Sequence, residues 1–295
     1  MNTIVITGCS TGFGRDAARR FAEAGHRVFA TMRNVEGSNA GAAGELRYLA
    51  EESDWALEVV ELDVTDDASV RAAAEKVLSG AGAPDVVINN AGVMFVGLTE
   101  AYTPEEVHWQ LDVNVVGVHR VLRAFLPGMR ARGSGLVINV SSVAGRIATP
   151  FSAVYNASKW ALEGYSLGLR REIAQTGVDV VVVEPGPFGT ELFPQAPAPE
   201  DAEGRADTYP ESVDQAYEGL MEAFDGMFSD PDVPTDPGLV VDRYVELVEM
   251  EPGTRPFRSV VGLDFGVAAR NADDEKHDPP LLEAFGMTEF TTLRT

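Results

Sequence analysis

The fold of this chain is decided by one stretch near its beginning, ITGCSTGFGRDAARRFAEAG (6–25). It starts at the end of an apolar run, turns through Gly8, Gly12 and Gly14, and continues into a helical pattern. Glycines at such a turn let a phosphate approach the backbone, and the N-terminus of the following helix favours an anion there. The stretch therefore predicts a pyrophosphate site, although three glycines can also serve a turn alone.

Short β-rich runs alternate with longer helical patterns up to about residue 185, and several runs are near-continuous Val, Ile and Leu. We therefore expect an α/β fold, a doubly wound parallel sheet of about seven strands with helices on both faces. The expected strands span residues 3–7, 27–31, 57–64, 85–90, 135–142, 178–185 and 257–262. The expected helices span residues 14–24, 42–52, 67–79, 104–126, 153–175, 212–228 and 237–250.

The pattern changes after the sixth expected strand, where residues 185–212 are rich in Pro, acidic and small side chains. Long insertions of this kind often cover a site rather than form a separate domain. We expect a single domain over residues 1–270, with a substrate lid over about 186–235. Residues 271–295 begin with a polar run and are expected to form a peripheral tail.

The composition excludes several classes of protein. Acidic residues outnumber basic ones 46 to 23, and the net charge of −23 argues against nucleic acid or a membrane surface as a partner. No apolar stretch approaches the length of about 18 residues that a membrane span needs. The single cysteine, Cys9, and an N-terminus without a secretory pattern predict a cytoplasmic protein. The acidic, lysine-poor composition suggests a salty cytoplasm, although GC-rich coding also favours Arg over Lys.

Five motifs resemble, in the same order, those of the short-chain dehydrogenase/reductase family: TGCSTGFG (7–14), DV (63–64), NNAG (89–92), YNASK (155–159) and PGPFGT (185–190). The whole sequence is also similar, less specifically, to the hydroxysteroid and retinol dehydrogenase branch. The resemblance implies a Rossmann-type fold and an oxidoreductase that acts on CH–OH and C=O groups with a nicotinamide cofactor. The cofactor-binding residues that it implies are Thr7, Gly8, Ser10, Thr11, Gly12, Phe13, Gly14, Asp63, Val64, Asn90, Ala91, Gly92, Tyr155, Lys159, Pro185, Gly186 and Thr190.

The end of the second expected strand favours NADP(H) over NAD(H). Enzymes that bind NAD usually have a carboxylate about 20 residues past the glycines, where it holds the ribose hydroxyls. Here the chain reads Thr31-Met32-Arg33, and the first carboxylate is Glu36. A carboxylate would repel a 2′-phosphate, whereas Arg33 can pair with it. The alternative is that Arg33 is an ordinary solvated residue after a strand.

Tyr155 and Lys159 lie four residues apart on an expected helix and therefore share a face. A free tyrosine, with a pKa of about 10, is a poor acid or base near neutral pH. A nearby ammonium and the charge of an oxidised nicotinamide favour the phenolate and lower that pKa. We therefore expect Tyr155 to act as the general acid and base, and the family resemblance also assigns the nicotinamide ribose to Lys159.

Two further residues complete the catalytic tetrad that the resemblance implies. Ser142 ends a predicted parallel strand, where its hydroxyl can hold the substrate oxygen, while strand alternation sends its rival Ser141 to the opposite side. Asn114 lies in a helix interior, where Asn has a poor propensity. In the family this residue opens the helix and holds a water that relays protons from the lysine. Its alternative is a buried amide bonded to neighbouring backbone.

An apolar set suits a bulky, weakly polar ketone or secondary alcohol as the substrate, although each aromatic residue equally suits the core. These expected pocket residues are Met94, Phe95, Phe151, Phe188, Leu192 and Phe193. No His or Cys cluster has metal-ligand spacing, so no metal is expected. Family members commonly pair through the helices that hold the catalytic Asn and Tyr, which implies a homodimer or homotetramer.

Two other classes of function stay open. An NADP(H)-binding regulatory or scaffold protein would keep the glycine loop without needing the tetrad. A sugar-nucleotide epimerase or dehydratase would share the fold and the Tyr-x-x-x-Lys pair. Such enzymes usually show G-x-x-G-x-x-G and a larger C-terminal domain, which the glycine spacing and the short C-terminal part disfavour here.

Overall fold

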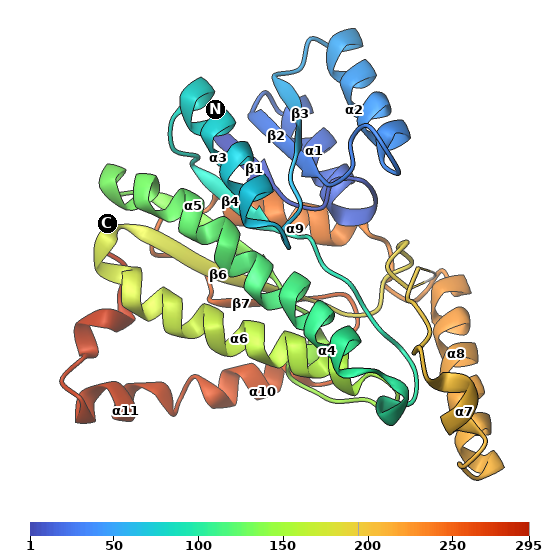
Figure 1. The fold of residues 1–295 in the computed structure, drawn as a ribbon. Coiled ribbons are helices and arrows are strands. Elements are labelled where there is room, and N and C mark those ends of the chain that lie inside the picture. Colours follow the sequence, from blue (N-terminus) through green and yellow to red (C-terminus); the bar gives the residue numbers. More distant parts are fainter. Residues whose placement is uncertain (194, 295) are drawn as a thin grey trace.

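A seven-stranded sheet runs through the centre of the molecule, and each strand is parallel to its neighbours (Figure 1). The computed structural model describes residues 1–193 and 195–294; residue 194, in the expected lid, and residue 295, in the expected tail, lie outside the described residues. The strand order is β3-β2-β1-β4-β5-β6-β7, which confirms the predicted fold class. The strands are β1 (Thr3–Ile6), β2 (Arg27–Met32), β3 (Leu57–Glu61), β4 (Val86–Asn89), β5 (Gly135–Val140), β6 (Val178–Pro185) and β7 (Arg258–Val261).

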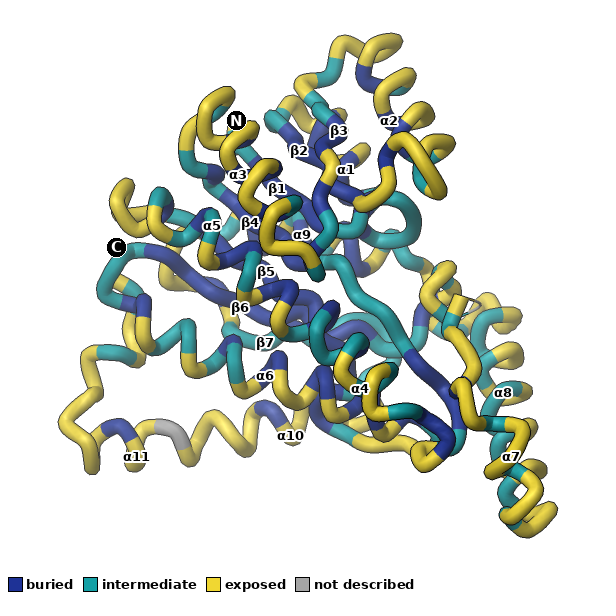
Figure 2. The backbone as a smooth tube through the Cα atoms, viewed as in Figure 1, coloured by how far each residue is buried: buried dark blue, intermediate teal, exposed yellow. Residues whose placement is uncertain are grey.

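Helices cover both faces of the sheet, and the sheet between them is buried (Figure 2). Side chains of β1 alternate between the two faces, so that Ile4 and Ile6 join one apolar cluster and Val5 joins the other. The first cluster includes residues of α1 (Gly12–Glu23), α2 (Ala40–Glu52) and α9 (Gly238–Glu249). The second includes residues of α3 (Asp67–Ala81), α5 (Gly117–Arg132) and α6 (Ala153–Ile173).

The helix expected over residues 104–126 is interrupted. It consists of α4 (Pro104–Leu111), a π-helical turn (Asp112–Val116) and α5, which extends to Arg132. The side chain of Asn114 leaves this turn to bond the backbone of Val93, and a Cβ at Gly117 would lie 2.8 Å from the Cβ of Val64. A π-helical turn of this kind is frequent at functional sites. Short 3-10 turns lie at Thr99–Ala101, Val143–Gly145, Ala174–Thr176 and Thr288–Thr291.

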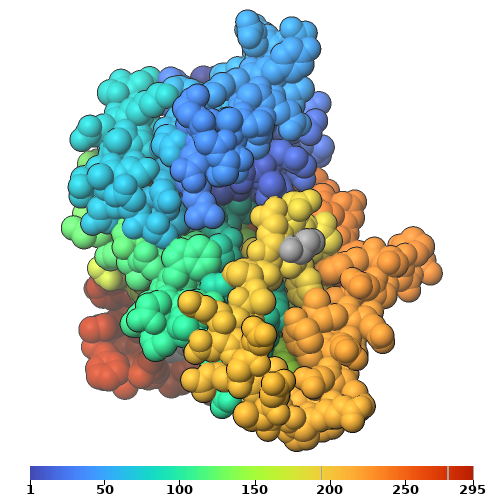
Figure 3. All heavy atoms as spheres, turned by 45° about the vertical axis from the view of Figure 1, so that its right-hand side comes forward, coloured from blue at the N-terminus to red at the C-terminus, as the bar shows by residue number. Residues whose placement is uncertain are grey.

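The segment after β6 projects from the sheet and carries α7 (Ala202–Ala206) and α8 (Glu211–Ser229) (Figure 1). None of the residues of α8 is buried. The atoms of this segment, yellow and orange in the space-filling view, gather on one face of the molecule beside green atoms from the middle of the chain (Figure 3).

The C-terminal part is less peripheral than the sequence predicts. Helices α10 (Val267–Asp274) and α11 (Asp278–Ala284) lie alongside α6 (Figure 1). Asn271 is 5% exposed and Leu282 is 6% exposed, so the tail packs on the body of the protein. The expected boundary at residue 270 was wrong because it cuts α10. Among the described residues, no helix combines the length and apolarity needed to cross a membrane.

Candidate active site

A cavity of about 800 Å³ opens at the carboxyl edge of the sheet, where the chain leaves β1 to β6. Ligands of open parallel sheets bind at this edge. Most of the predicted site residues line the cavity, although they come from segments far apart in the sequence. The exceptions are Thr7, Gly14, Phe95, Asn114 and Phe151.

The glycine loop after β1 has two left-handed positions, Gly8 (φ +71°) and Gly12 (φ +54°). A Cβ on Gly14 would lie 2.3 Å from the carbonyl oxygen of Gly8, and one on Gly8 would lie 2.8 Å from the Cα of Ala91. These two glycines are therefore required for packing within the loops. Gly12 is different, because the nearest atom to its Cβ position is 3.6 Å away, on Thr190. Since α1 begins at Gly12, its free N–H groups are presented to the cavity.

Thr7 clamps the loops after β1 and β4 together. Its buried hydroxyl oxygen accepts hydrogen bonds from the backbone N–H groups of Asn90 and Ala91, both at 3.0 Å. The Asn90 amide in turn donates to the carbonyl oxygens of Thr7 (2.9 Å) and Gly8 (3.1 Å). Thr7 thus shapes the loop from behind and does not face the cavity.

The predicted cofactor-selecting residue, Arg33, directly follows β2, is exposed and lines the cavity. The first carboxylate after it, Glu36, forms an ion pair with Arg47 at 3.4 Å. The carboxylate of Glu61, on the neighbouring strand, accepts hydrogen bonds from the backbone N–H groups of Asn34 and Val35, both at 2.8 Å. Both nearby carboxylates are therefore engaged with other groups, which leaves the Arg33 guanidinium in a position that fits a phosphate.

Tyr155 and Lys159 occupy successive turns of α6 and both line the cavity; their exposed fractions are 7% and 6%. The Lys159 ammonium lies 5.7 Å from the centre of the Tyr155 ring and donates a hydrogen bond to the Val140 carbonyl (2.9 Å). The Ser142 hydroxyl donates to the Pro185 carbonyl (3.2 Å) and accepts from the Ala144 N–H (3.1 Å). The structure therefore brings together three of the four predicted tetrad side chains at one wall.

The electrostatics of this wall differ from the expectation. Burial raises the pKa of Tyr155 to about 12, and its hydrogen bond with Ser142 opposes that rise. Burial lowers the pKa of Lys159 to about 8, and the negative charge of Glu163 opposes that fall. The raised pKa of Tyr155 differs from the predicted lowering, because removal of the phenolate from water is the largest influence on this side chain.

Asn114, the fourth tetrad residue, lies behind the cavity and is 1% exposed. Its amide oxygen accepts from the Val93 N–H (2.9 Å), and its amide nitrogen donates to the Val93 carbonyl and to the Ser158 hydroxyl (both 2.9 Å). The Cβ position of Gly92 lies 3.5 Å from the Asn114 amide oxygen and 3.7 Å from the Lys159 nitrogen. Asn114 and Lys159 therefore converge beside Gly92.

Two of the six expected pocket residues were wrong. Phe95 is 2% exposed and packs on Tyr102 and Trp109, with ring centres at 5.2 and 5.5 Å. Phe151 has a left-handed backbone (φ +61°) and packs against Tyr217, with the ring centres 5.3 Å apart. Both side chains fill space between secondary-structure elements. The other four, Met94, Phe188, Leu192 and Phe193, line the cavity.

Sequence reasoning missed the contribution of α8, which lines the cavity with Leu220, Phe224, Met227 and Phe228. The rings of Phe193 and Phe224 are 4.6 Å apart, so the segment after β6 forms an aromatic cluster with this helix. The spacing i, i+4, i+7 and i+8 is the signal that was available, because it places these side chains on one helix face.

The residues at hand fit a nicotinamide dinucleotide. Gly12, at the start of α1, lines the cavity where the helix N-terminus suits a pyrophosphate, and Arg33 suits a further phosphate. The buried Lys159 has N–H groups beyond the one that bonds Val140. The described residues contain no group of His, Cys, Asp and Glu that could hold a metal ion.

Comparisons with known proteins identify the family of this chain. The family described as short chain dehydrogenase matches residues 2–201. A 3-ketodihydrosphingosine reductase of Bacteroides thetaiotaomicron is 40% identical over 187 residues, 63% of this chain and 64% of the relative. The human 17-beta-hydroxysteroid dehydrogenase type 1 is 39% identical over 210 residues, 70% of this chain and 63% of the relative. The chain thus spans less than two thirds of each of these relatives.

The likeness to a solved structure extends over nearly the whole chain. The crystal structure of a short-chain dehydrogenase from Streptomyces avermitilis superposes with a TM-score of 0.72 and is 31% identical. The match covers 97% of each of the two chains.

Proposed function

Because this chain belongs to the short-chain dehydrogenase family, we propose that it is an NADP-dependent oxidoreductase for a ketone or secondary alcohol. The observation that carries the proposal is the meeting of Ser142, Tyr155 and Lys159 on one wall of the cavity. The bound nicotinamide supplies or accepts the hydride. The protein supplies the binding surface, the orientation of the substrate and the proton.

In the reduction direction, Tyr155 donates its phenolic proton to the substrate oxygen, and in oxidation it takes that proton back. The phenol is the form present at neutral pH, since burial raises its pKa to about 12. The Ser142 hydroxyl holds the same oxygen and stabilises the charge that develops there. Lys159 places a buried positive charge beside the ring, which favours the phenolate that forms when the proton leaves.

The preference for NADP(H) over NAD(H) rests on Arg33. Its side chain lines the cavity at the end of β2, and the neighbouring carboxylates Glu36 and Glu61 are engaged elsewhere. A guanidinium can bond a 2′-phosphate in a bidentate way, which supports this preference.

The proposed substrate is bulky and mainly apolar. The cavity lining includes Phe188, Phe193 and Phe224, and pockets lined in this way bind apolar molecules. Relatives named for 3-ketodihydrosphingosine and for 17-beta-hydroxysteroids support the same substrate class. We propose that residues of about 186–235 form the lid of a single domain. We also propose that the protein is cytoplasmic and forms a homodimer or homotetramer.

Tyr155→Phe tests this function directly. The variant lacks the proton donor, so turnover of NADPH with a panel of bulky ketones is expected to fall by about 10² to 10⁴ fold. Binding of NADPH, measured by fluorescence titration, is expected to stay close to that of the unaltered protein. Tyr165→Phe on the same helix is the matched control, because Tyr165 bonds His119 instead (3.1 Å). Retained turnover in Tyr155→Phe would contradict the proposed role of this residue.

A further inference from the structure

Glu163 is a buried acid on the helix that carries Tyr155 and Lys159. It follows Lys159 by four residues, so it lies one helical turn further along α6. Its exposed fraction is 2%, and its Oε2 lies 2.9 Å from the Nε of Arg258 on β7. The proposed reaction does not use Glu163, yet an isolated buried carboxylate is unfavourable unless it is paired. Its position calls for an explanation.

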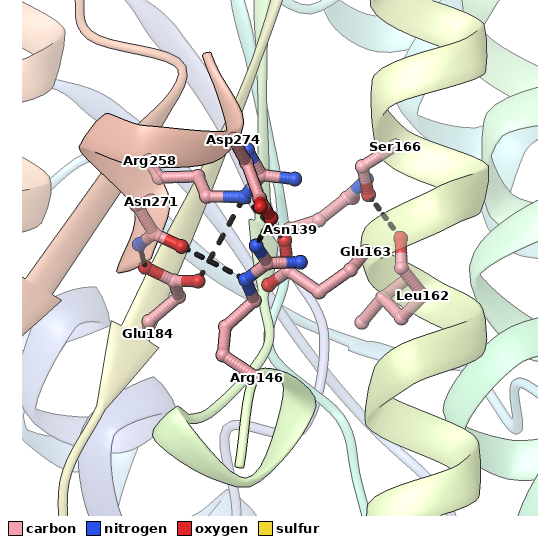
Figure 4. A network of polar contacts seen from close by, with 9 residues as sticks. All are labelled: Asn139, Arg146, Leu162, Glu163, Ser166, Glu184, Arg258, Asn271 and Asp274. Carbon is pink, nitrogen blue, oxygen red and sulfur yellow. Dashed lines mark hydrogen bonds and ion pairs between the residues drawn. The ribbon is translucent and has the colours of Figure 1, made fainter. Parts of the chain in front are cut away.

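Glu163 belongs to a network of polar side chains that reaches the C-terminal helix α10 (Figure 4). The Nε of Arg258 also lies 3.8 Å from Glu184 on β6, and the Asn271 amide donates to the other oxygen of Glu184 at 2.6 Å. The Arg146 side chain donates to the amide oxygen of Asn271 at 2.8 Å and pairs with Asp274. The network therefore connects α6, β6, β7, α10 and the turn after β5.

Two acids, Glu163 and Glu184, lie beside the Arg258 guanidinium. Burial and the proximity of Glu163 raise the pKa of Glu184 well above its usual range, so Glu184 retains its proton near neutral pH. Glu163 is also the closer of the two acids to Arg258. The charged or titratable groups around Glu163 are Lys159 on its own helix, Arg146 from the turn after β5, Glu184 from β6, Arg258 from β7 and Asp274 from α10.

The turn that holds Ser142 lies directly on this part of α6. A Cβ at Gly145 would lie 2.8 Å from the Ser141 hydroxyl, 3.1 Å from the Cγ of Glu163 and 3.2 Å from the Lys159 carbonyl. No side chain fits between the turn and the helix there, and Glu163 and Lys159 are only 2% and 6% exposed. In such a dry region charges influence one another more strongly than in solvent. Lys159 bonds Val140 and Glu163 bonds Arg258, and the negative charge of Glu163 raises the pKa of Lys159 against the effect of burial.

We propose that Glu163 is a positioning residue for Lys159. The carboxylate of Glu163, fixed by Arg258, maintains the positive charge of the Lys159 ammonium at the catalytic wall. This inference rests on the proposed function of Lys159. It also gives α10 a role, because its buried Asn271, together with Arg146, completes the network that keeps the two acids in place.

The titration of Lys159 in Glu163→Gln tests the inference without any substrate. The chain contains only three lysines, so protein labelled with ¹³C-lysine gives three resonances to follow. The other two, Lys76 and Lys276, have side chains that are 51% and 71% exposed and serve as internal references. Removing the negative charge is expected to lower the pKa of Lys159 by about one unit, the lower end of the effect of an opposite charge at short range. The apparent pKa of the high-pH limb in the pH profile of ketone reduction is expected to fall by the same amount.

Glu172→Gln is the matched control, because it makes the same chemical change at an exposed position of the same helix. An unchanged Lys159 titration in Glu163→Gln, or an equal shift in Glu172→Gln, would overturn the inference. If Glu163→Gln does not fold, the Lys159 pKa is measured in Arg258→Gln and in the double variant Arg258→Gln/Glu163→Gln. Neither variant contains an Arg258 cation without its partner. The double variant is then expected to have the lower Lys159 pKa, and equal values would count against the proposal. Retained turnover in Tyr155→Phe, in contrast, contradicts only the proposed function.

Discussion

Burial and charge act against each other at single residues of this site. Lys159 is one of three lysines in a chain of net charge −23, and it is 6% exposed. Burial lowers its pKa to about 8, so that it carries its charge below that pH and loses it above. The ammonium is therefore available at neutral pH and below.

Arg33→Asp tests the cofactor preference at the scale of one residue. The change removes a guanidinium that suits a 2′-phosphate and places a like charge beside it, so the ratio of kcat/KM for NADPH over NADH is expected to fall at least about tenfold. Steady-state kinetics with both cofactors measure the ratio. Arg71→Asp is a suitable control, because it makes the same change of charge at an exposed position of α3 that does not line the cavity. An unchanged ratio in Arg33→Asp would rule out a role for this residue in selection.

At the scale of an element, the glycine loop separates packing from binding. Gly14 and Gly8 allow the loop to contact its neighbours, whereas a Cβ at Gly12 would meet only the Thr190 side chain, at an ordinary contact distance of 3.6 Å. The sequence motif treats the three positions alike, since each is simply a glycine in a turn. The helix α8 differs from the glycine loop. Its apolar spacing is visible in the sequence, but most of the cavity that it lines is formed by other segments.

Gly14→Ala and Gly12→Ala are expected to differ in stability. A Cβ at Gly14 would meet the Gly8 carbonyl at 2.3 Å, so the backbone must move, with a loss of about 2–3 kcal/mol. At Gly12 the loss is expected to be about 1 kcal/mol, from the left-handed backbone alone. Denaturant unfolding of the two variants measures both values. Equal losses would show that Gly14 is not restrained by this contact.

At the scale of the whole molecule, excess negative charge dominates the surface. The net charge is −23, while many of the ion pairs join exposed side chains such as Lys276 and Asp273. Exposed pairs contribute only about 0–1 kcal/mol each to stability, so the protein loses little stability when salt screens them. Repulsion among the excess acids acts over longer distances. Salt reduces the length over which such charges interact from about 10 Å at 0.1 M to about 3 Å at 1 M. Screening is therefore expected to stabilise the folded protein.

The melting temperature is expected to rise when potassium chloride is increased from about 0.1 to about 2 M. Differential scanning fluorimetry measures the change. Potassium sulfate serves as the comparison, because it strengthens apolar burial whatever the charge of the protein. A rise in sulfate without any rise in chloride would contradict both the screening argument and the adaptation to a salty cytoplasm.

The sequence by itself determined the parallel sheet and the order of its motifs. Val-rich runs and glycine spacing are local patterns, and each motif ends a strand whose position the alternation of strands and helices fixes. Tyr155 and Lys159 could be paired in advance because one helical turn separates them. The same local reasoning identified Arg33 as the residue after β2, and it lines the cavity as predicted.

The tertiary structure alone decided which residues meet. Phe95 and Phe151 were assigned to the pocket by residue type, but contacts with Tyr102 and Tyr217 place them elsewhere. The raised pKa of Tyr155 depends on burial by several elements at once, which no local pattern reports. The network of Glu163 joins residues up to 128 positions apart in the chain, since hydrogen bonds depend on distance in space and not on spacing in sequence. Sequence periodicity therefore predicted the strands and the helical turn, whereas the environment of each catalytic group had to come from the folded chain.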